Sequence, residues 1–592
     1  MMTMNNEKGI ALVMTLLIVV VLIVLGSVFT LRTINEWAAA SAERRQTQAF
    51  YLAEGGAHAG LDQIDTLINN YMLNTISASN PQVVISTTQN YVASGDGLGF
   101  LDNYVEDGGT PQLTISGSEA TNTISTVSLG DGSYGVNIII TEKSNPAATG
   151  FDEWQFPYFF RLESTGQAGN IARKVLLVGD FTVRVQRDNF AKYALFTNQQ
   201  SMPNGTRVWF TDKTNFAGPL HTNDRYNIAL NPSATFDGSV TQYQETARFY
   251  NQGWPVLLDA ESNGTRDVPS FNSGFTRDAE QIALSSAVQK QDMIDQALAS
   301  DTISGDGIYV PNDGVQLTGG IYVEGDADVS LNTADVLDGG GVVLYTNSVY
   351  TVTQAGTTKV ITVDETANST TIQTVGIGTE NFVGVPDGVL DVGTIIYVNG
   401  DVDSLSGTIQ EDSELTIASE NDIVVTDHVR YSKYKAAVNS PGDAGYEPPY
   451  VATSINDARC SPGCDPYYGQ NLLGIVSWNG DVRVGTSAPD NVDLHGTILA
   501  QNGIFSVDNY FDQGVGDRGT ATLLGGVITD YYGAFGLFNG STGQQIAGYG
   551  RNFVYDNRME IGNAPPYFPS LNTFIAFTND IIDKITLQEG GF

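Results

Sequence analysis

Residues 10–29 form an uninterrupted apolar run, IALVMTLLIVVVLIVLGSVF, that contains no charged side chain. A helix of this length spans about 30 Å, which is the thickness of the hydrocarbon core of a bilayer. A secretory signal peptide is the first alternative, but its apolar region is shorter and ends in a small-residue cleavage site that this run lacks. The run therefore predicts one membrane-spanning helix. Because most of the chain follows it, we expect a cytoplasmic N-terminus and an exported body.

The helical pattern continues beyond the apolar run. Residues 31–73 contain no proline, and one face carries apolar residues at spacings of three and four, namely Phe50, Ala53, Ala57, Leu61, Ile64 and Ile68. This periodicity is typical of an amphipathic helix that packs one face against a core. The sequence thus predicts one rod over residues 10–73, about 90 Å long.

Two segments of this rod resemble the N-terminal region of PilX-type minor pilins. A short polar leader over residues 1–9 ends in Lys8-Gly9, like a prepilin signal, and residues 48–57, QAFYLAEGGA, are similar to the family's A-F-x-x-A-E-x-G segment, which includes Glu54. The resemblance implies that prepilin peptidase cleaves after Gly9 and leaves Ile10 as the mature N-terminus. It also implies an inner-membrane anchor that later packs against other pilins in a type IV pilus. A plain signal-anchor, with no role for Gly9, is the alternative.

One position departs from the pattern of major pilins. These carry a glutamate five residues into the mature chain, where this sequence has Met14. A buried carboxylate needs a charged partner, which the family account places at the amino terminus of a neighbouring subunit. Met14 cannot neutralise that amine, and the same departure occurs in tip-located pseudopilins and PilX-like subunits. We therefore expect a tip or priming subunit rather than a shaft subunit.

Composition excludes several classes of protein. The chain of 592 residues has 28 basic and 66 acidic side chains, a formal charge of −38. Such a surplus of acid argues against nucleic acid as a partner, because no basic stripe is available to displace counterions from phosphates. The two cysteines exclude a disulfide-dense scaffold. Sixty-four glycines and 10% aromatic residues favour a β-rich body with many turns over a disordered acidic chain.

Residues 74–188 read as short strands separated by glycine-rich turns. Val83 to Ile85, Val136 to Thr141 and Lys174 to Val185 are rich in β-branched residues, and the turns include Gly95 to Gly97 and Gly130 to Gly132. We expect a small antiparallel sheet packed on the C-terminal half of the rod. That placement depends on the pilin analogy as much as on the pattern.

Residues 189–570 contain a repeat with a period in the low twenties. Asn-Gly or Asn-Asp pairs precede short apolar strands at Asn399, Asn421, Asn479 and Asn502. Glycine and asparagine tolerate positive φ at corners, and stacked coils bury one another's aliphatic side chains. The repeat predicts a parallel β-helix, or β-solenoid. The predicted fold is therefore mainly β with a long N-terminal helix: a pilin-like helix and sheet, then an interrupted solenoid.

Three segments interrupt the predicted solenoid, and a fourth follows it. We expect a helix over residues 276–300, outward hairpins over residues 348–392 and a Tyr/Pro-rich loop over residues 431–470. Residues 571–592 form a C-terminal segment. The segments Gly218 to Asn223 (GPLHTN), Phe553 to Met559 and Pro565 to Pro569 resemble an uncharacterised domain found after PilX-type N-termini, which implies no activity.

Few residues in the sequence suggest a catalytic site, a metal site or a disulfide. Cys460 and Cys464 are four apart, which in an exported protein favours a local disulfide over a metal site, since no histidine lies nearby in the sequence. The histidines, at positions 58, 221, 428 and 495, form no metal or catalytic motif. His221 lies in the family-like turn, where we expect a structural hydrogen bond. Apart from a weak calcium possibility, no cofactor is expected.

Acidic pairs are the basis of that calcium possibility. Asp326 and Asp328, and also Asp401 and Asp403, are spaced to present oxygen ligands, as are Asp335 and Asp338. None of these pairs matches an EF-hand or a glycine-rich calcium repeat, so solvated turn carboxylates are the alternative.

Two functions remain open. The first is structural: a minor pilin or pseudopilin that displays a solenoid at the cell surface, with adhesion as one outcome. The second is a membrane-anchored β-helix enzyme acting on polysaccharide, which needs paired carboxylates about 5–10 Å apart. Stacked coils would have to bring residues such as Asp401 and Asp481 together. No enzyme motif occurs in the chain, so we expect no enzyme activity.

Overall fold

The computed structural model describes most of the chain and divides it into two compact units. The first unit comprises residues 1–186 and 573–592, and the second comprises residues 187–572. The described residues are 6–150, 153–211, 214–229, 234–250, 254–264, 267–284, 287–439, 441, 444–455, 457–460, 463–539, 544–561, 563–578 and 586–590.

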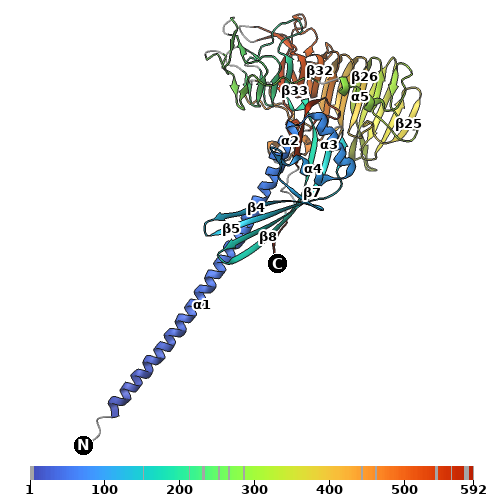
Figure 1. Ribbon diagram of the computed structural model, residues 1–592. Coiled ribbons are helices and arrows are strands. Elements are labelled where there is room, and N and C mark those ends of the chain that lie inside the picture. Colours follow the sequence, from blue (N-terminus) through green and yellow to red (C-terminus); the bar gives the residue numbers. More distant parts are fainter. Residues whose placement is uncertain are drawn as a thin grey trace. The chain divides into compact units, whose positions relative to one another are not determined.

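The first unit begins with one long helix. Helix α1 (Asn6–Asp65) continues through a π-helical stretch, η1 (Thr66–Met72), into α2 (Leu73–Ala78), and the chain becomes extended at Ser79 (Figure 1). The predicted face is confirmed: Ala53, Ala57, Ile64 and Ile68 are fully buried or nearly so. The predicted long N-terminal helix is therefore confirmed.

Two further helices occupy a region where the sequence analysis predicted strands. Helix α3 (Pro81–Ser94) contains Val83 to Ile85, and α4 (Gly97–Tyr104) follows it, so the predicted strand at residues 83–85 is wrong. The start signals were present in the sequence, because Asn80 is followed by proline at the first helical position. Asp96 caps α4 by accepting a hydrogen bond from Gly99 N at 2.8 Å. These signals outweigh the β propensity of three consecutive residues.

An antiparallel sheet packs against the C-terminal half of α1. Strands β4 (Glu119–Leu129), β5 (Gly132–Glu142), β7 (Glu153–Ala168) and β8 (Ile171–Asn189) pair in that order (Figure 1). Burial alternates along β7, which gives the sheet one face toward the helix and one toward solvent. The remaining strands of this unit are β1 (Glu106–Asp107), β2 (Thr110–Pro111), β3 (Thr114–Ser116), β6 (Ala147–Gly150), β36 (Ser570–Thr578) and β37 (Thr586–Gly590).

The predicted C-terminal segment, residues 571–592, is part of this sheet. Both β36 and β37 pair with β8, and β37 does so in the antiparallel sense, with Thr586 opposite Val178. The Phe574 ring stacks on Trp154 at 6.2 Å between centroids. The end of the chain thus returns to the unit that contains its beginning.

Glycines allow the helix to approach the sheet at backbone distance. A Cβ atom on Gly166 of β7 would lie 2.1 Å from Ala49 O and 2.4 Å from Ala53 N, closer than any real contact. On the helix side, a Cβ on Gly60 would lie 3.1 Å from side-chain atoms of Leu162 and Val136. Only glycine at position 166 lets the two backbones meet.

The second unit is built on a ladder of parallel strands. Neighbouring strands of this ladder pair in register and in the parallel sense, and Figure 1 shows several of them side by side, among them β32, β33 and β26. These strands are β18 (Phe275–Thr276), β14 (Val240–Gln242), β11 (Leu220–Thr222), β9 (Leu195–Gln199), β33 (Asp517–Tyr531), β32 (Asp493–Val507), β30 (Leu472–Ser477), β28 (Glu414–Ser419), β26 (Thr394–Asn399) and β20 (Ile321–Glu324).

The order of this ladder is not the order of the sequence. The first strand, β9, lies in the interior of the ladder, and the chain then moves outward to β18 at one end. It resumes near the other end at β20 and returns strand by strand to β33, which pairs with β9 at Val527 opposite Leu195. Two series of strands therefore meet at the β9–β33 junction.

A second parallel ladder accompanies the first, so that successive coils place one strand in each. It consists of β21 (Ala327–Leu337), β27 (Val402–Ile409), β29 (Ile423–Tyr431), β31 (Val482–Val484) and the end of β32. A third row joins the ends of β27 and β29 to the start of β32, the start of β33 and β35 (Gln545–Val554). Shorter parallel pairs join β10 (Asn215–Phe216), β13 (Thr235–Phe236) and β17 (Ser270–Phe271), and join β12 (Asn227–Ile228) to β15 (Ala247–Phe249). Aliphatic and aromatic side chains from these strands form one continuous core.

Antiparallel strands make the sheets of this unit mixed. β22 (Val343–Gln354), β23 (Thr357–Asp364), β24 (Ser369–Thr374) and β25 (Gly378–Val383) form a meander in the region predicted as hairpins. Three further strands also pair in the antiparallel sense, namely β16 (Val256–Leu258) with β15, β19 (Gly307–Tyr309) with β20, and β34 (Gly536–Phe538) with β35. The chain is thus a long helix followed mainly by strands, as predicted, in sheets of mixed direction.

The predicted helix at residues 276–300 is shorter than expected. Helix α5 covers Ala287–Leu298, and Thr276 belongs to β18. Asp278 has φ 60° and Ala299 has φ 51°, and a right-handed helix cannot continue through such residues. The loop predicted over residues 431–470 contains two short 3₁₀ turns, η4 (Ala458–Cys460) and η5 (Asp465–Tyr467). A third 3₁₀ turn, η6, covers Asn557–Ile561, and η2 covers Phe190–Lys192.

We predict that G166A loosens the attachment of α1 to the sheet. The added methyl group must displace the backbone of Ala49, and overpacking of this kind costs about 1–3 kcal/mol. Hydrogen exchange of the amides of residues 49–64 in the detergent-solubilised chain should become faster. G135A is the matched control, because its Cβ would be 3.7 Å from the nearest atom. Equal exchange in the two variants would refute the close contact.

Candidate functional surfaces: the uncovered helix and the ladders of the second unit

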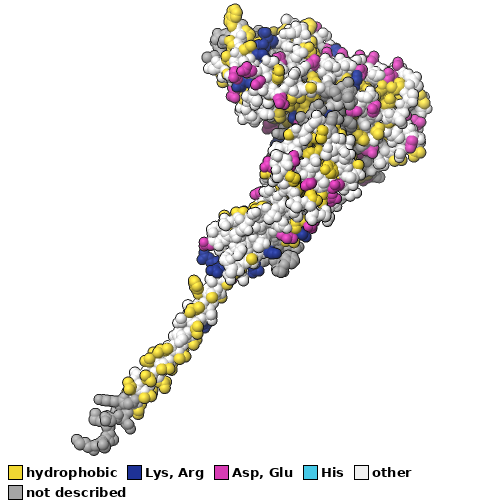
Figure 2. All heavy atoms as spheres, in the orientation of Figure 1, with side chains coloured by type: hydrophobic (Ala, Val, Ile, Leu, Met, Phe, Trp, Pro, Cys, Tyr) yellow, Lys and Arg dark blue, Asp and Glu magenta, His cyan; other side chains and the backbone are white. Residues whose placement is uncertain are grey.

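The N-terminal half of α1 is an apolar surface that none of the described residues covers. Figure 2 shows hydrophobic side chains around this half of the helix, and the apolar window within it is 0% buried. Among the described residues, α1 with its continuation to Ala78 is the single helix long and apolar enough to cross a membrane. Its few hydroxyl groups are satisfied internally: Thr30 Oγ1 donates to Gly26 O at 2.7 Å, and Thr15 Oγ1 donates to Ala11 O at 2.5 Å. Such bonding suits a helix in lipid, where no water is available.

The residues that the pilin resemblance singled out lie on this helix. Gly9 and Ile10 are in its first turns, and Ile10 and Met14 are exposed to 63% and 61%. Glu54 lies in the half that packs on the sheet, next to the buried Ala53, and is itself half-buried. The structure therefore separates them: Ile10 and Met14 belong to the uncovered half, whereas Glu54 marks the covered half.

In the second unit, the repeated Asn-Gly and Asn-Asp pairs form the corners between the two parallel ladders. At each corner an aspartate carboxylate accepts a hydrogen bond from the backbone N–H of the next coil. Asp326 Oδ1 accepts from Asp401 N at 2.9 Å, and Asp401 Oδ1 accepts from Asp422 N at 3.0 Å. Asp422 Oδ1 accepts from Asp481 N at 2.8 Å, and Asp481 Oδ1 accepts from Ile504 N at 2.9 Å. We call these four residues the aspartate ladder.

Glycine and serine complete the same corners. A Cβ on Gly400 would lie 2.6 Å from the Gly325 carbonyl carbon, and one on Gly503 would lie 2.2 Å from Gly480 O. Ser419 Oγ donates to Gly400 O and Ser477 Oγ donates to Asn421 O, each at 2.6 Å. The sequence repeat therefore marks the corners at which neighbouring strands hydrogen-bond one another, and at Gly400 and Gly503 no side chain would fit.

Two of the acidic pairs considered as calcium ligands lie at or beside these corners. Asp326 and Asp401 use their carboxylates in the aspartate ladder, while Asp328 and Asp403 are exposed beside it. Burial, together with the neighbouring carboxylates Asp326, Asp401 and Asp328, raises the pKa of Asp403. Within the described part of the chain, no group of three or more metal-ligating side chains is arranged to hold an ion.

Asp401 and Asp481, the carboxylates considered for polysaccharide chemistry, both belong to the aspartate ladder. Asp422 lies between Asp401 and Asp481 in the aspartate ladder, so these two are separated by a whole coil. Asp422 also binds Arg483 through Oδ2 at 2.7 Å. Each of these carboxylates therefore has a structural role in the stacking of coils.

A second row of polar side chains runs along the same corners. Glu324 accepts hydrogen bonds from Tyr322 Oη at 2.7 Å and from Asn399 Nδ2 at 3.0 Å. Glu420 accepts from Tyr397 Oη at 2.9 Å and from Asn479 Nδ2 at 2.7 Å, and it pairs with Lys290 of α5 at 2.7 Å. The rings of Tyr322 and Tyr397 stack at 5.9 Å. Burial and the nearby glutamates raise the pKa of both tyrosines.

His221 is a ladder residue, as the sequence analysis expected. Its Nδ1 lies 2.8 Å from Thr241 Oγ1 and its Nε2 lies 3.0 Å from Asn223 Oδ1, and its ring stacks on Phe196 at 5.2 Å. Burial lowers its pKa. Asn223 extends the network by donating to Asn198 Oδ1 at 3.1 Å. These contacts link successive coils and leave both ring nitrogens engaged.

The other histidines do not come together with His221. His58 is exposed on α1. His428 Nδ1 accepts from Asp493 N at 3.0 Å, and His495, which is fully buried, accepts from Tyr431 N at 3.0 Å. Nε2 of His495 has no hydrogen-bond partner, and the Tyr434 ring lies edge-on at 4.4 Å from the imidazole. Burial lowers the pKa of His495 to about 3.

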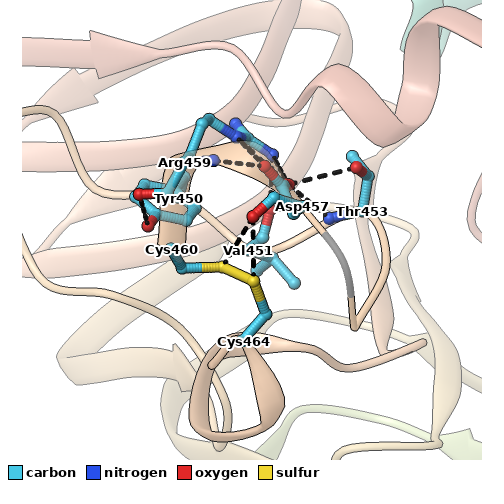
Figure 3. Close-up of a disulfide and its surroundings, with 7 residues drawn as sticks. All are labelled: Tyr450, Val451, Thr453, Asp457, Arg459, Cys460 and Cys464. Atoms are coloured by element: carbon cyan, nitrogen blue, oxygen red, sulfur yellow. Dashed lines mark hydrogen bonds and ion pairs between the residues drawn. A yellow bond between two sulfur atoms is a disulfide. The ribbon is translucent and has the colours of Figure 1, made fainter. Parts of the chain in front are cut away.

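Cys460 and Cys464 are bonded to each other in the loop before β30 (Figure 3). Arg459 stacks on the Tyr450 ring at 4.5 Å and pairs with Asp457 at 2.6 Å. Hydrogen bonds from Arg459 hold the pKa of Asp457 well below its usual range. Closing so short a loop removes little chain entropy, so the bond stabilises the loop locally.

Sequence reasoning missed one buried ion pair. Arg558 is 7% exposed, pairs with Asp556 at 2.6 Å, and donates to Gly469 O at 3.0 Å and Asn471 O at 2.8 Å. It thus fixes the end of the 431–470 loop, and its guanidinium lies over the Tyr431 ring at 5.0 Å. The segment had been noted only as a family-like motif. An arginine two residues after an aspartate in an otherwise uncharged segment was the signal available.

We predict that the aspartate ladder contributes directly to the stability of the second unit. D422A leaves the Asp481 N–H without an acceptor and Arg483 without one of its partners, which should cost about 1–3 kcal/mol in chemical denaturation. D328A, at an exposed position beside the ladder, should change stability by less than about 0.5 kcal/mol. Equal losses in both variants would show that the ladder bonds do not matter.

We predict that His495 makes the second unit less stable in acid. Its folded pKa of about 3 lies below the unfolded value, so the unfolded state binds the extra proton and stability falls as the pH drops from about 6.5 toward 3. Between pH 7.5 and 5 this group should account for a loss of about 2 kcal/mol. H495Q should lose less stability over that interval than the parent chain. An identical pH dependence in both proteins would refute the assignment.

Two family models match the chain. The model described as PilX N-terminal matches residues 8–57, and the one described as a domain of unknown function (DUF4900) matches residues 153–244. No match was found among curated proteins or among solved structures.

The first match coincides with the uncovered half of α1 and the start of its contact with the sheet. The second match includes the segment at Gly218 to Asn223 that the sequence analysis assigned to such a domain, whereas the family-like segments at residues 553–569 lie outside it. The chain therefore carries a PilX-type pilin N-terminal region, followed by a stretch that matches a domain of unknown function.

Proposed function

We propose that this protein is a minor pilin or pseudopilin of a type IV pilus or a related filament system. The observation that carries the proposal is the coincidence of the PilX-type match, residues 8–57, with a helix half whose apolar surface is left uncovered by the residues that the structure describes. Such a surface is stable in only two settings, a bilayer or a bundle of similar helices. A pilin uses both, first as an inner-membrane anchor and then as a filament subunit.

The proposed role is at the tip or in priming, and it is not enzymatic. Met14 supplies no carboxylate to a neighbouring subunit's amine, and a second unit of residues 187–572 is large for a position repeated along a thin shaft. We further propose that the parallel ladders of this unit form a β-solenoid that is displayed for surface interaction. In-register parallel pairing and the aspartate ladder support that interpretation.

The proposal includes processing. Prepilin peptidase would cleave after Gly9, so that the mature chain starts at Ile10 with its body in the periplasm and then at the cell surface. The partners are other pilins, which contact the uncovered half of α1.

The test is the N-terminal sequence of the mature protein in the native host, together with filament counts. We expect a start at Ile10, and we expect G9V to retain the leader and reduce piliation or surface attachment. G26V is the control for processing alone, because Gly26 lies beyond the cleavage site and a Cβ there has no atom within 4 Å in the free chain. A different mature start refutes processing, and unchanged piliation and attachment after deletion of the protein refute the assembly role.

A further inference from the structure

Positive charge in the first unit gathers at one end of its sheet. Arg44 and Arg45 lie on α1 just before its contact with β7, and both are exposed. Gly169, in the turn between β7 and β8, lies beside Arg45: a Cβ built on it would be 3.4 Å from Arg45 Nη1. Arg173 and Lys174 follow this turn on β8. We call these four residues the basic collar, and Figure 2 shows dark-blue side chains where the helix leaves the sheet.

The basic collar is positively charged, whereas the chain as a whole has a negative net charge. The chain has a formal charge of −38, yet four cations lie at this end of the sheet, against three carboxylate residues: Glu43 beside Arg44, Asp131 in the turn between β4 and β5, and Glu589 of β37 opposite Val175. The local surplus is positive, and it adjoins the uncovered half of α1. A concentration of cations beside a membrane-spanning segment is the arrangement that attracts anionic headgroups.

The length of the helix brings the collar to the membrane surface. From Ile10 to Trp37 the helix rises about 40 Å, which is close to the thickness of a bilayer including its headgroups, about 40–45 Å. Trp37 is 76% exposed, as expected of an aromatic residue at the lipid–water interface. Arg44 lies about 10 Å further along the helix, roughly one Debye length from the headgroups. Arginine side chains can extend toward the surface and shorten that gap.

We propose that the basic collar binds the anionic phospholipid headgroups of the outer leaflet while the subunit is still anchored in the inner membrane. This inference rests on the membrane-anchor stage of the proposed function. Each cation near the surface adds a modest electrostatic attraction, and salt weakens the contact. Such a contact holds the first unit close to the bilayer before assembly and is weak enough to break when the subunit is extracted.

The test measures the distance between the collar and the membrane. The full-length chain carrying N170C, labelled at the exposed turn between β7 and β8, is inserted into nanodiscs that contain a headgroup-labelled lipid acceptor. The native cysteines are bonded to each other and do not compete for the label. In phosphatidylglycerol-containing discs the donor–acceptor distance should be shorter than in phosphatidylcholine discs by about one Debye length, ~8 Å. About 1 M salt should abolish the difference.

Matched variants identify the residues responsible. R44Q/R45Q should lose the lipid-dependent shortening, R44K/R45K should keep it, and K143Q/R161Q, which removes two cations from the body of the same sheet, should also keep it. Equal distances in the two lipids, or a shortening that R44Q/R45Q retains, would overturn the proposal. If R44Q/R45Q instead lowers incorporation into filaments with no lipid effect, the collar contacts a protein and the lipid assignment is wrong. A chain that does not enter the discs at all refutes the membrane anchor itself, a separate and recognisable outcome.

Discussion

The close contact between α1 and β7 is the constraint on which the first unit depends. At Gly166 the two backbones approach so closely that no side chain fits, and this contact marks where the helix passes from uncovered to covered. On one side of it, Ala53, Ala57 and Ile64 are buried against the sheet. On the other side, every large apolar residue of the helix is exposed and requires a bilayer or other helices. One helix therefore serves two environments because a single glycine contact fixes the boundary between them.

The second unit depends on a different interaction, a hydrogen bond between an aspartate carboxylate and a backbone N–H that repeats from corner to corner. Each strand of the parallel ladders buries its inward aliphatic residues against those of the strands paired with it, so side-chain burial and backbone pairing repeat together. The aspartate ladder links them, because each carboxylate accepts the N–H that begins the next coil. The same bonds give these acidic residues a structural role, which is to join neighbouring strands at the corners. Acidity in this unit is partly structural and not only a means of solubility.

Local sequence patterns differed in how well they predicted the secondary structure. The apolar run and the spacing of Ala53, Ala57 and Ile64 predicted α1, because a helical face is defined within a few residues. The strand predicted at Val83 to Ile85 was wrong, since three β-branched residues are a weaker signal than a helix start at Asn80-Pro81. The helix predicted from residue 276 was too long because the positive φ of Asp278 is set by the turn after β18 and leaves no trace in the apolar periodicity. The corners at Asn399, Asn421, Asn479 and Asn502 were found because they repeat.

The sequence by itself determined the long N-terminal helix, its division into an apolar and an amphipathic half, and the positions of the recurring corners. These features depend on residues close together in the chain, or on a motif that repeats. Only the tertiary structure decided that β9 lies beside β33, that the C-terminal strands return to the first sheet, that Asp422 separates Asp401 from Asp481, and that Arg45 lies beside the turn preceding Lys174. Each of these depends on contacts between residues far apart in the chain, which arise from how the coils stack and how the sheet packs, and no local pattern encodes them.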